Sequence, residues 1–347
     1  MRVSDIETPA LVLDLDRVER NIAETQAYCD EHGLAFRPHI KTHKIPALAH
    51  WQMRAGAVGI ACQKLGEAEV MAAAGVPDIL IPYNIIGASK LERLVRLTHQ
   101  AAMSVAVDSE LTVRGLSEAM AAHGTSVGVL IEVATTIERA GVVATEEVIR
   151  LARLIESLPG LEWRGIMLYP SNAENAAHLQ AVCEALDAAG LTPKVVSGGG
   201  SPSMRRQHEV PRLTEVRIGT YIFEDMTGVR GGYFSLERCA ATLLCTVVSA
   251  PTPDRVILDG GSKTLTTEGG PPFGYIVELP DAQIYKLNEE HAYVDVSACP
   301  TKPQIGDRVH VIPNHVCVAV NLHNQAYGVR GDWVEVIWPI AARGLVQ

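Results

Sequence analysis

The feature that most constrains this 347-residue chain is a regular alternation of short apolar runs with longer helical patterns between about residues 34 and 225. The short runs are rich in β-branched residues, and the longer stretches repeat apolar residues at helical spacing, which is typical of consecutive βα units. The strand candidates are residues 34–38, 58–62, 78–82, 103–107, 127–133, 164–169, 193–197 and 213–219. Eight strands, each followed by a helix, predict a closed (β/α)8 barrel.

After about residue 235 the sequence changes to strand-like runs separated by Gly, Pro and Asp, with no long helical pattern. The run TPALVLDLD near the start is also strand-like, and we expect it to pair with the C-terminal sheet. A helical pattern follows it over residues 16–31. We therefore predict an α/β fold with a TIM-like barrel over residues 12–232 and a β domain formed by residues 1–11 and 233–347.

The composition narrows the classes of partner. A formal net charge of −10 argues against binding to nucleic acid or to an anionic membrane, because either surface attracts a basic protein. Small molecules are the expected partners. The seven cysteines are scattered, with no C-x-x-C pair, which predicts reduced thiols. No signal peptide and no bilayer-spanning run is visible, so we predict a cytoplasmic protein.

A cluster of basic residues follows the first barrel strand. The run P-H-I-K-T-H-K brings together His39, Lys41, His43 and Lys44. In a barrel, the loops after the strands gather at one mouth, where active sites form. A lysine amine there can form an imine with an aldehyde cofactor. The alternative is a solvated basic loop, since charge runs are usually on the surface.

Two glycine-containing loops follow the last two barrel strands. The first is S-G-G-G-S, with Ser197, Gly198, Gly199, Gly200 and Ser201, and the second contains Gly219, Thr220 and Tyr221. Adjacent glycines let backbone amides surround a phosphate, and phosphate sites in barrels are often built from these two loops. A plain turn is the alternative for either loop alone. A phosphate cradle and an amine at one mouth are the two anchors that pyridoxal phosphate needs.

Four more polar residues follow barrel strands and are candidates to line the cofactor or substrate: Gln63, Asn84, Arg139 and Tyr169. Arginine pairs with anions through two parallel hydrogen bonds, and tyrosine offers both a ring and a donor. Each of them alone is compatible with an ordinary loop position.

A possible metal pair lies in the β domain. In the run I-P-N-H-V-C, His315 and Cys317 are two residues apart, so on a strand their side chains would share one face. Imidazole and thiolate are suitable ligands for zinc and similar metals. Two ligands are too few for a structural site, so a metal here would keep positions open for water or substrate. The alternative is a core cysteine beside a hydrogen-bonded histidine.

Ordered motifs along the chain resemble the D-threonine aldolase and D-serine dehydratase family of fold-type III pyridoxal-phosphate enzymes. In these enzymes an alanine-racemase-like barrel is joined to a β domain. The resemblance rests on TPALVLDLD, RPHIKTHK (37–44), CQKLGEAE (62–69), SGGG (197–200), GTYIFED (219–225), RVILDGGSKT (255–264), NEEH (288–291), IPNHVCVAVNLHN (312–324) and WPIAARG (338–344).

The resemblance implies a role for each site residue. Lys41 would hold the cofactor covalently, the SGGG and GTY backbones would surround its phosphate, and Arg139, Gln63 and Tyr169 would line it. His315 and Cys317 would bind a divalent metal, Zn, Mn or Mg. Members of the family are usually homodimers, so a homodimer is expected.

Two departures from the family pattern bear on the reaction. Aldolases of the family typically carry histidine and aspartate at the metal pair, whereas His315 and Cys317 resemble the dehydratase branch. Pro170 and Ser171 also follow Tyr169, where both branches tend to have a histidine. The substrate hydroxyl would then need another polar partner, such as His43 or a metal-bound water.

The expected function is a metal-assisted lyase that cleaves small D-3-hydroxy-amino acids to glycine and an aldehyde. The alternative is a dehydratase acting on D-serine or D-3-hydroxyaspartate and releasing a 2-oxo acid and ammonia. An amino-acid racemase, which needs no metal, and a non-catalytic cofactor-binding protein are further alternatives.

Overall fold

The computed structural model describes all 347 residues, and the chain divides into two compact units. The barrel unit consists of Glu24–Lys41, Pro46–Gly219 and Leu345–Gln347. The sheet unit consists of Met1–Ala23, Thr42–Ile45 and Thr220–Gly344. The first long helix, α1 (Leu15–Glu31), begins in the sheet unit and ends in the barrel unit.

The barrel unit contains an eight-stranded sheet whose paired strands all run parallel, in the order β2-β9-β8-β7-β6-β5-β4-β3. Its strands are β2 (Ala35–Phe36), β3 (Ile60–Ala61), β4 (Asp78–Ile81), β5 (Ala102–Val107), β6 (Val127–Glu132), β7 (Leu161–Met167), β8 (Val195–Gly198) and β9 (Glu215–Val216). A parallel bridge between His39 and Ala61 joins the two ends of this order. The predicted TIM-like barrel and its eight strands are confirmed.

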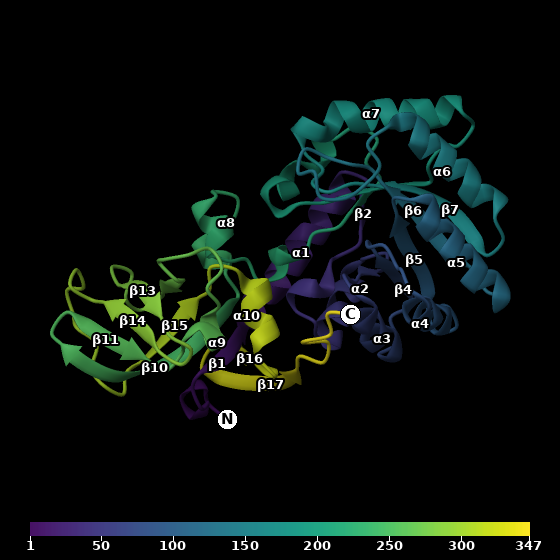
Figure 1. The fold of residues 1–347 in the computed structure, drawn as a ribbon. Coiled ribbons are helices and arrows are strands. Elements are labelled where there is room, and N and C mark those ends of the chain that lie inside the picture. Colours follow the sequence, from purple (N-terminus) through teal and green to yellow (C-terminus); the bar gives the residue numbers. More distant parts are fainter. The chain divides into compact units, whose positions relative to one another are not determined.

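Helices between successive strands of the barrel unit pack around the sheet (Figure 1). They are α2 (Pro46–Ala55), α3 (Leu65–Ala73), α4 (Ala88–Thr98), α5 (Glu110–Ala122), α6 (Thr145–Ser157) and α7 (Ala173–Ala188). The expectation of a full helix after every strand is wrong for the last two. A 3-10 segment, η3 (Ser201–Glu209), follows β8, and only the short η4 (Thr220–Ile222) and α8 (Met226–Arg230) follow β9. The non-helical backbone of Arg206 interrupts that segment, so it does not form a regular α-helix.

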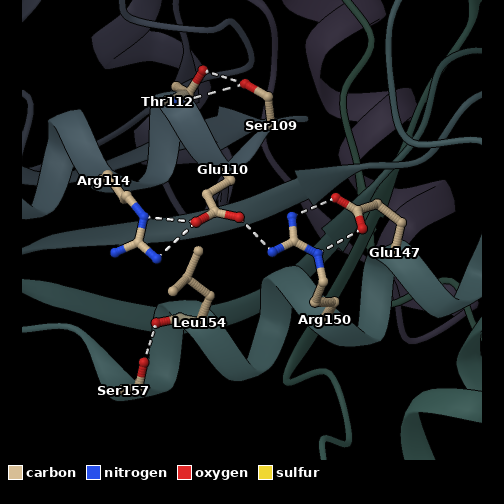
Figure 2. Close-up of polar contacts among 8 residues, drawn as sticks. All are labelled: Ser109, Glu110, Thr112, Arg114, Glu147, Arg150, Leu154 and Ser157. Carbon is tan, nitrogen blue, oxygen red and sulfur yellow. Dashed lines mark hydrogen bonds and ion pairs between the residues drawn. The ribbon is translucent and has the colours of Figure 1, made fainter.

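The helices α5 and α6 each have one apolar face that is buried and one polar face that is exposed to solvent. Both helices bury apolar residues at helical spacing, such as Val113, Leu116 and Met120 in α5. Figure 2 shows the opposite, solvent-facing side, where Glu110 of α5 accepts hydrogen bonds from Arg114 at 2.7 Å and from Arg150 of α6 at 2.5 Å. This ion-pair network links the two helices on the surface.

The sheet unit is built on a nine-stranded mixed sheet, whose main order is β13-β14-β11-β10-β1-β16-β17. Its strands are β1 (Ala10–Asp14), β10 (Ala241–Thr252), β11 (Arg255–Leu258), β12 (Tyr275–Ile276), β13 (Gln283–Leu287), β14 (Ala292–Asp295), β15 (Arg308–Ile312), β16 (Gln325–Arg330) and β17 (Trp333–Pro339). The N-terminal strand β1 lies between β10 and β16, which confirms its predicted pairing with the C-terminal sheet.

Short helices complete the sheet unit, and one of them corrects the sequence prediction. They are η1 (Val3–Asp5), η5 (Leu236–Arg238), α9 (Ser262–Leu265) and α10 (Val316–Leu322), with α9 and α10 in contact. The placement of His315 and Cys317 on a strand is wrong, because α10 begins directly after His315. The alternating run V-C-V-A-V resembles a strand, but its first backbone amide is capped by a side chain from elsewhere in the unit. None of the helices in the chain has the length and apolar character required to span a membrane.

Candidate active site

The four basic side chains in the loop that follows β2 differ in their exposure to solvent. His39, His43 and Lys44 are buried, whereas Lys41 is exposed. Lys44 donates from Nζ to the carbonyl oxygen of Ala342 at 3.5 Å. A solvated basic loop therefore does not describe this segment. Lys41 is the one amine of this run that is open to a ligand.

The backbone around Lys41 is held by a histidine. The backbone N–H of Lys41 donates to Nδ1 of His39 at 3.3 Å, and Nε2 of the His39 ring lies 3.1 Å from Oε1 of Gln63. Because Nδ1 accepts, the neutral ring carries its proton on Nε2 and donates it to Gln63. Two predicted site residues, Lys41 and Gln63, are thus joined through His39.

His43 makes a similar local bond. The ring is fully buried, and its Nδ1 accepts the backbone N–H of Ile45 at 3.0 Å. The neutral ring therefore carries its proton on Nε2. In this state neither ring nitrogen of His43 has a lone pair left to act as a base.

The glycine loop after β8 leaves backbone amides available. Gly200 is buried with a φ of 144°, and neither its amide nor that of Ser201 has an acceptor in the protein. The amides of Gly219 and Thr220, after β9, also have no acceptor. Tyr221, which follows them in η4, is fully buried. Amides without partners next to glycines are suitable donors for a phosphate group.

Gly198 and Gly199, the other two glycines of the triplet, lie too close to neighbouring atoms to carry a side chain. A Cβ at Gly199 would overlap the carbonyl oxygen of Arg217, and one at Gly198 would overlap the side chain of Ser171. The amide of Gly199 donates to Oγ of Ser171 at 2.7 Å, and the amide of Ser171 donates back to the carbonyl of Gly199 at 2.9 Å. The segment after Tyr169 thus braces the loop, so the amide of Gly199 is already committed to the protein.

Ser197, at the end of β8, belongs to a buried polar network. Its hydroxyl donates to Glu215 at 2.6 Å and accepts from Arg217, which also donates to the carbonyl of Leu168 at 3.2 Å. Burial lowers the pKa of Arg217 to about 10. The Ser197 side chain is therefore occupied within the protein. Arg217 was not among the predicted site residues.

Arg139 and Tyr169 are brought together in the barrel unit. The guanidinium carbon of Arg139 lies 5.0 Å from the centre of the Tyr169 ring, a cation–π contact. Nη2 of Arg139 is 3.5 Å from Oε1 of Glu132, a carboxylate whose pKa is raised by burial. Arg139 also lines a cavity of about 680 Å³ with Glu174, His178 and the loop after β6. The cavity is large enough for a small ligand.

The candidate metal pair lies in the sheet unit, at the start of α10. His315 is the N-cap residue and Cys317 is in the first turn. Hydrogen bonds to Asp225 and, to a lesser extent, Cys317 raise the pKa of His315 to about 10. Oγ1 of Thr42, the residue after Lys41 in the chain, lies 3.2 Å from Sγ of Cys317. The pair is not part of a group of three histidine, cysteine, aspartate or glutamate side chains that could together hold a metal ion.

The residues present fit both groups implied by the sequence. For pyridoxal phosphate, the chain offers an exposed lysine amine and backbone amides without partners. For a divalent metal, it offers one imidazole and one sulfur, and the remaining coordination would come from water or substrate. Asp225, which hydrogen-bonds His315, was missed because nothing in its local sequence distinguishes it from an ordinary helix cap.

Comparison with known proteins identifies the family. Residues 13–226 match the family described as alanine racemase, N-terminal domain, and residues 240–329 match the putative serine dehydratase domain. The chain is 36% identical to D-threonine aldolase from Arthrobacter sp, over 98% of this chain and 93% of that protein. This chain belongs to the D-threonine aldolase and D-serine dehydratase family. Its predicted membership is confirmed.

Solved structures of the family agree in fold. The D-threonine aldolase from Filomicrobium marinum is 31% identical, with a TM-score of 0.93, covering 100% of this chain and 98% of that one. A cysteine-to-alanine variant of a D-threo-3-hydroxyaspartate dehydratase, in its metal-free form, is 26% identical with a TM-score of 0.86, covering 98% of each chain. Both the aldolase and the dehydratase branches of the family thus share this architecture.

Proposed function

We propose that this protein is a metal-assisted pyridoxal-phosphate lyase that cleaves D-3-hydroxy-amino acids between Cα and Cβ, giving glycine and an aldehyde. The observation that carries the proposal is that Lys41 alone is exposed among four basic side chains in its loop. Burial of the other three leaves one amine to hold the cofactor. The family relatives named as aldolases support the choice of reaction.

Each site residue is assigned a task in this proposal. Lys41 holds the cofactor, and the amides of Gly200, Ser201, Gly219 and Thr220 donate to its phosphate, with the buried Tyr221 following them in η4. Gln63, Arg139 and Tyr169 line the cofactor, while Ser197, Gly198 and Gly199 shape the loop that bounds it. The cofactor supplies an electron sink for the bonding pair released at Cα.

His315 and Cys317 are assigned to a divalent metal, Zn, Mn or Mg. Such an ion would polarise the 3-hydroxyl of the substrate as a Lewis acid. The metal-free cysteine variant of the related dehydratase supports a metal role for cysteine in this family. In the cleavage, the hydroxyl proton leaves to a base, the oxygen forms the aldehyde carbonyl, and the Cα–Cβ electrons remain on the glycine carbon until a proton replaces them.

His43 is assigned as a hydrogen-bond donor to the substrate oxygen. Its Nδ1 accepts from Ile45, so the neutral ring carries its proton on Nε2 and acts as a donor rather than as a base. A His43→Gln variant with full turnover would remove His43 from the proposal, and a metal-bound water would then be the polar partner.

The dehydratase reaction is the second candidate, and Cys317 is the observation that favours it. The His–Cys pair resembles that branch. In this reaction the α-proton and the 3-hydroxyl leave as water, and the product hydrolyses to a 2-oxo acid and ammonia. Both reactions use the same lysine and metal pair.

Product analysis separates the candidates. The purified, cofactor- and metal-loaded protein is incubated with D-threonine, D-serine or D-3-hydroxyaspartate. Glycine plus aldehyde supports the aldolase proposal, whereas a 2-oxo acid plus ammonia would overturn it in favour of the dehydratase. A chelator-resistant racemisation would reveal a racemase, and absence of any turnover would leave a cofactor-binding protein.

The proposal also assigns a role to each of the two units. The barrel unit is proposed to bind most of the cofactor, and the sheet unit is proposed to carry the metal pair. The protein is proposed to act as a cytoplasmic homodimer. Its seven cysteines are all free, which agrees with a reducing compartment. Light scattering on the purified protein tests the dimer.

A further inference from the structure

We propose that Asp225 is a positioning residue that fixes the imidazole of His315 so that Nε2 faces a divalent metal; this inference rests on the proposed metal role of His315 and Cys317. Asp225 has only 2% of its surface exposed, and its Oδ2 lies 3.0 Å from Nδ1 of His315. A ring nitrogen that donates to a carboxylate keeps its proton. Nε2 then remains the nitrogen whose lone pair can bind a metal.

The same carboxylate sets the start of α10. Oδ2 of Asp225 also accepts the backbone N–H of Val316, the first residue of that helix, at 3.2 Å. The imidazole of His315 and the backbone that carries it are therefore held by one atom. Cys317 follows in the first turn, so its position depends on where the helix begins.

The other oxygen ties this arrangement to a second helix. Oδ1 of Asp225 accepts the N–H of Gly228 at 3.1 Å and caps α8. The first two backbone amides of α8 donate hydrogen bonds to the segment before His315. Met226 donates to the carbonyl of Pro313 at 3.1 Å, and Thr227 donates to that of Asn314 at 3.0 Å. Asp225 thus links the N-termini of α8 and α10, both within the sheet unit.

Asp225 is not itself a third metal ligand. Both of its oxygens accept N–H donors, and it contacts the Nδ1 side of the ring rather than the Nε2 side. A carboxylate that accepts a hydrogen bond from the ring nitrogen opposite the metal raises the basicity of the histidine and selects one tautomer. Such a residue alters metal affinity without touching the metal.

The two oxygens make different contacts, and this gives a selective variant. Asp225→Asn has only one accepting oxygen; when this oxygen keeps the cap on Gly228, the amide NH2 faces His315 and Val316 and cannot accept from them. The ring can satisfy the new donor only by moving its proton to Nε2, and this removes the lone pair needed by the metal. Zinc affinity is expected to fall about 10- to 100-fold.

The experiment measures zinc binding to the full-length protein, independently of activity. Competition with a chromophoric chelator gives the affinity, and cobalt substitution reports the thiolate of Cys317 through its sulfur-to-metal absorption. Asp225→Asn should weaken zinc binding while the cofactor absorbance at Lys41 is unchanged. The matched control is Glu224→Gln, the adjacent buried carboxylate, which pairs with Arg238 at 2.9 Å. It should lower stability and leave zinc affinity intact.

Failure of the inference and failure of the proposed metal site give different results. If Asp225→Asn does not fold, Asp225→Ser retains a good helix cap without the carboxylate and takes its place. Wild-type affinity in either folded variant overturns the positioning role. If instead wild-type protein binds no zinc, or His315→Ala and Cys317→Ala bind it equally well, the proposed metal site itself is wrong.

Discussion

The carbonyl oxygen of Arg217 occupies the position that a Cβ at residue 199 would take. The last two barrel strands meet at this point, because the amide of Arg217 also donates to the carbonyl of Gly198 at 2.7 Å. Glycine at position 199 is therefore needed for the barrel to close around the loop, whatever ligand the loop holds.

A Gly199→Ala variant should be strongly destabilised. The extra methyl group meets backbone rather than a flexible side chain, so relieving the overlap requires movement of a strand. Overpacking of this kind costs about 1–3 kcal/mol or more. Urea denaturation measures the change.

The matched control is Gly115→Ala in α5, where the added Cβ would lie 3.7 Å from Cδ1 of Leu91. This variant should gain about 0.5–1 kcal/mol, because alanine has a higher helix propensity than glycine. Equal stability of the Gly199 and Gly115 variants would show that the β8 loop adjusts without cost.

Replacing Lys41 by alanine should abolish the visible absorbance of the bound cofactor and all turnover. The control is Lys44→Met, which removes a second lysine from the same loop and preserves most of its apolar volume. Because Lys44 is buried and donates to Ala342, this variant should retain the absorbance even if it is less stable. Absorbance that persists without Lys41 would assign the cofactor to another lysine.

Removal of divalent metal by a chelator should abolish lyase activity, and added zinc or manganese should restore it. The same treatment should leave the cofactor absorbance unchanged, because Lys41 and the backbone amides, and not the metal pair, are assigned to hold the cofactor. His315→Ala and Cys317→Ala should resemble the chelated wild type. Full lyase activity in the presence of chelator would contradict the metal role assigned to His315 and Cys317.

Acid stability should depend on His323. Its Nε2 donates to the carbonyl of Thr264 at 3.2 Å, and burial lowers its pKa below the ordinary value. The unfolded chain takes up a proton near pH 6.5, whereas the folded protein resists protonation. The stability from this site is therefore present above about pH 6.5 and is lost as the pH falls toward the folded-state pKa.

His323→Gln retains a donor toward Thr264 but does not titrate. The melting temperature of wild type should fall more steeply than that of the variant between pH 7 and pH 5. Parallel curves for the two proteins would contradict this assignment.

Much of the architecture could be predicted because it depends on local pattern. The eight barrel strands follow from apolar runs at regular spacing, and the exposed Lys41 lies in a loop whose motif stands out in the sequence. Signals of this kind occupy a few consecutive residues.

The parts that escaped prediction depend on partners distant in sequence. The V-C-V-A-V run forms the start of α10 because Asp225, far earlier in the chain, caps its first amide. Ser171 looks like a departure from the family pattern, yet it braces Gly199. Arg217 is an arginine in a strand-like run, and only the folded barrel shows it buried beside Ser197 and Glu215. Short-range periodicity contains none of this information.

The segment Thr42–Ile45 belongs to the sheet unit, although Lys41 before it and Pro46 after it belong to the barrel unit. A fragment that ended with the barrel would carry this segment, with the buried His43, without most of the unit to which it belongs. Chimaeras that exchange the C-terminal half between relatives therefore need the matching residues 42–45 as well. A single crossover point after residue 45 would separate this segment from most of its unit.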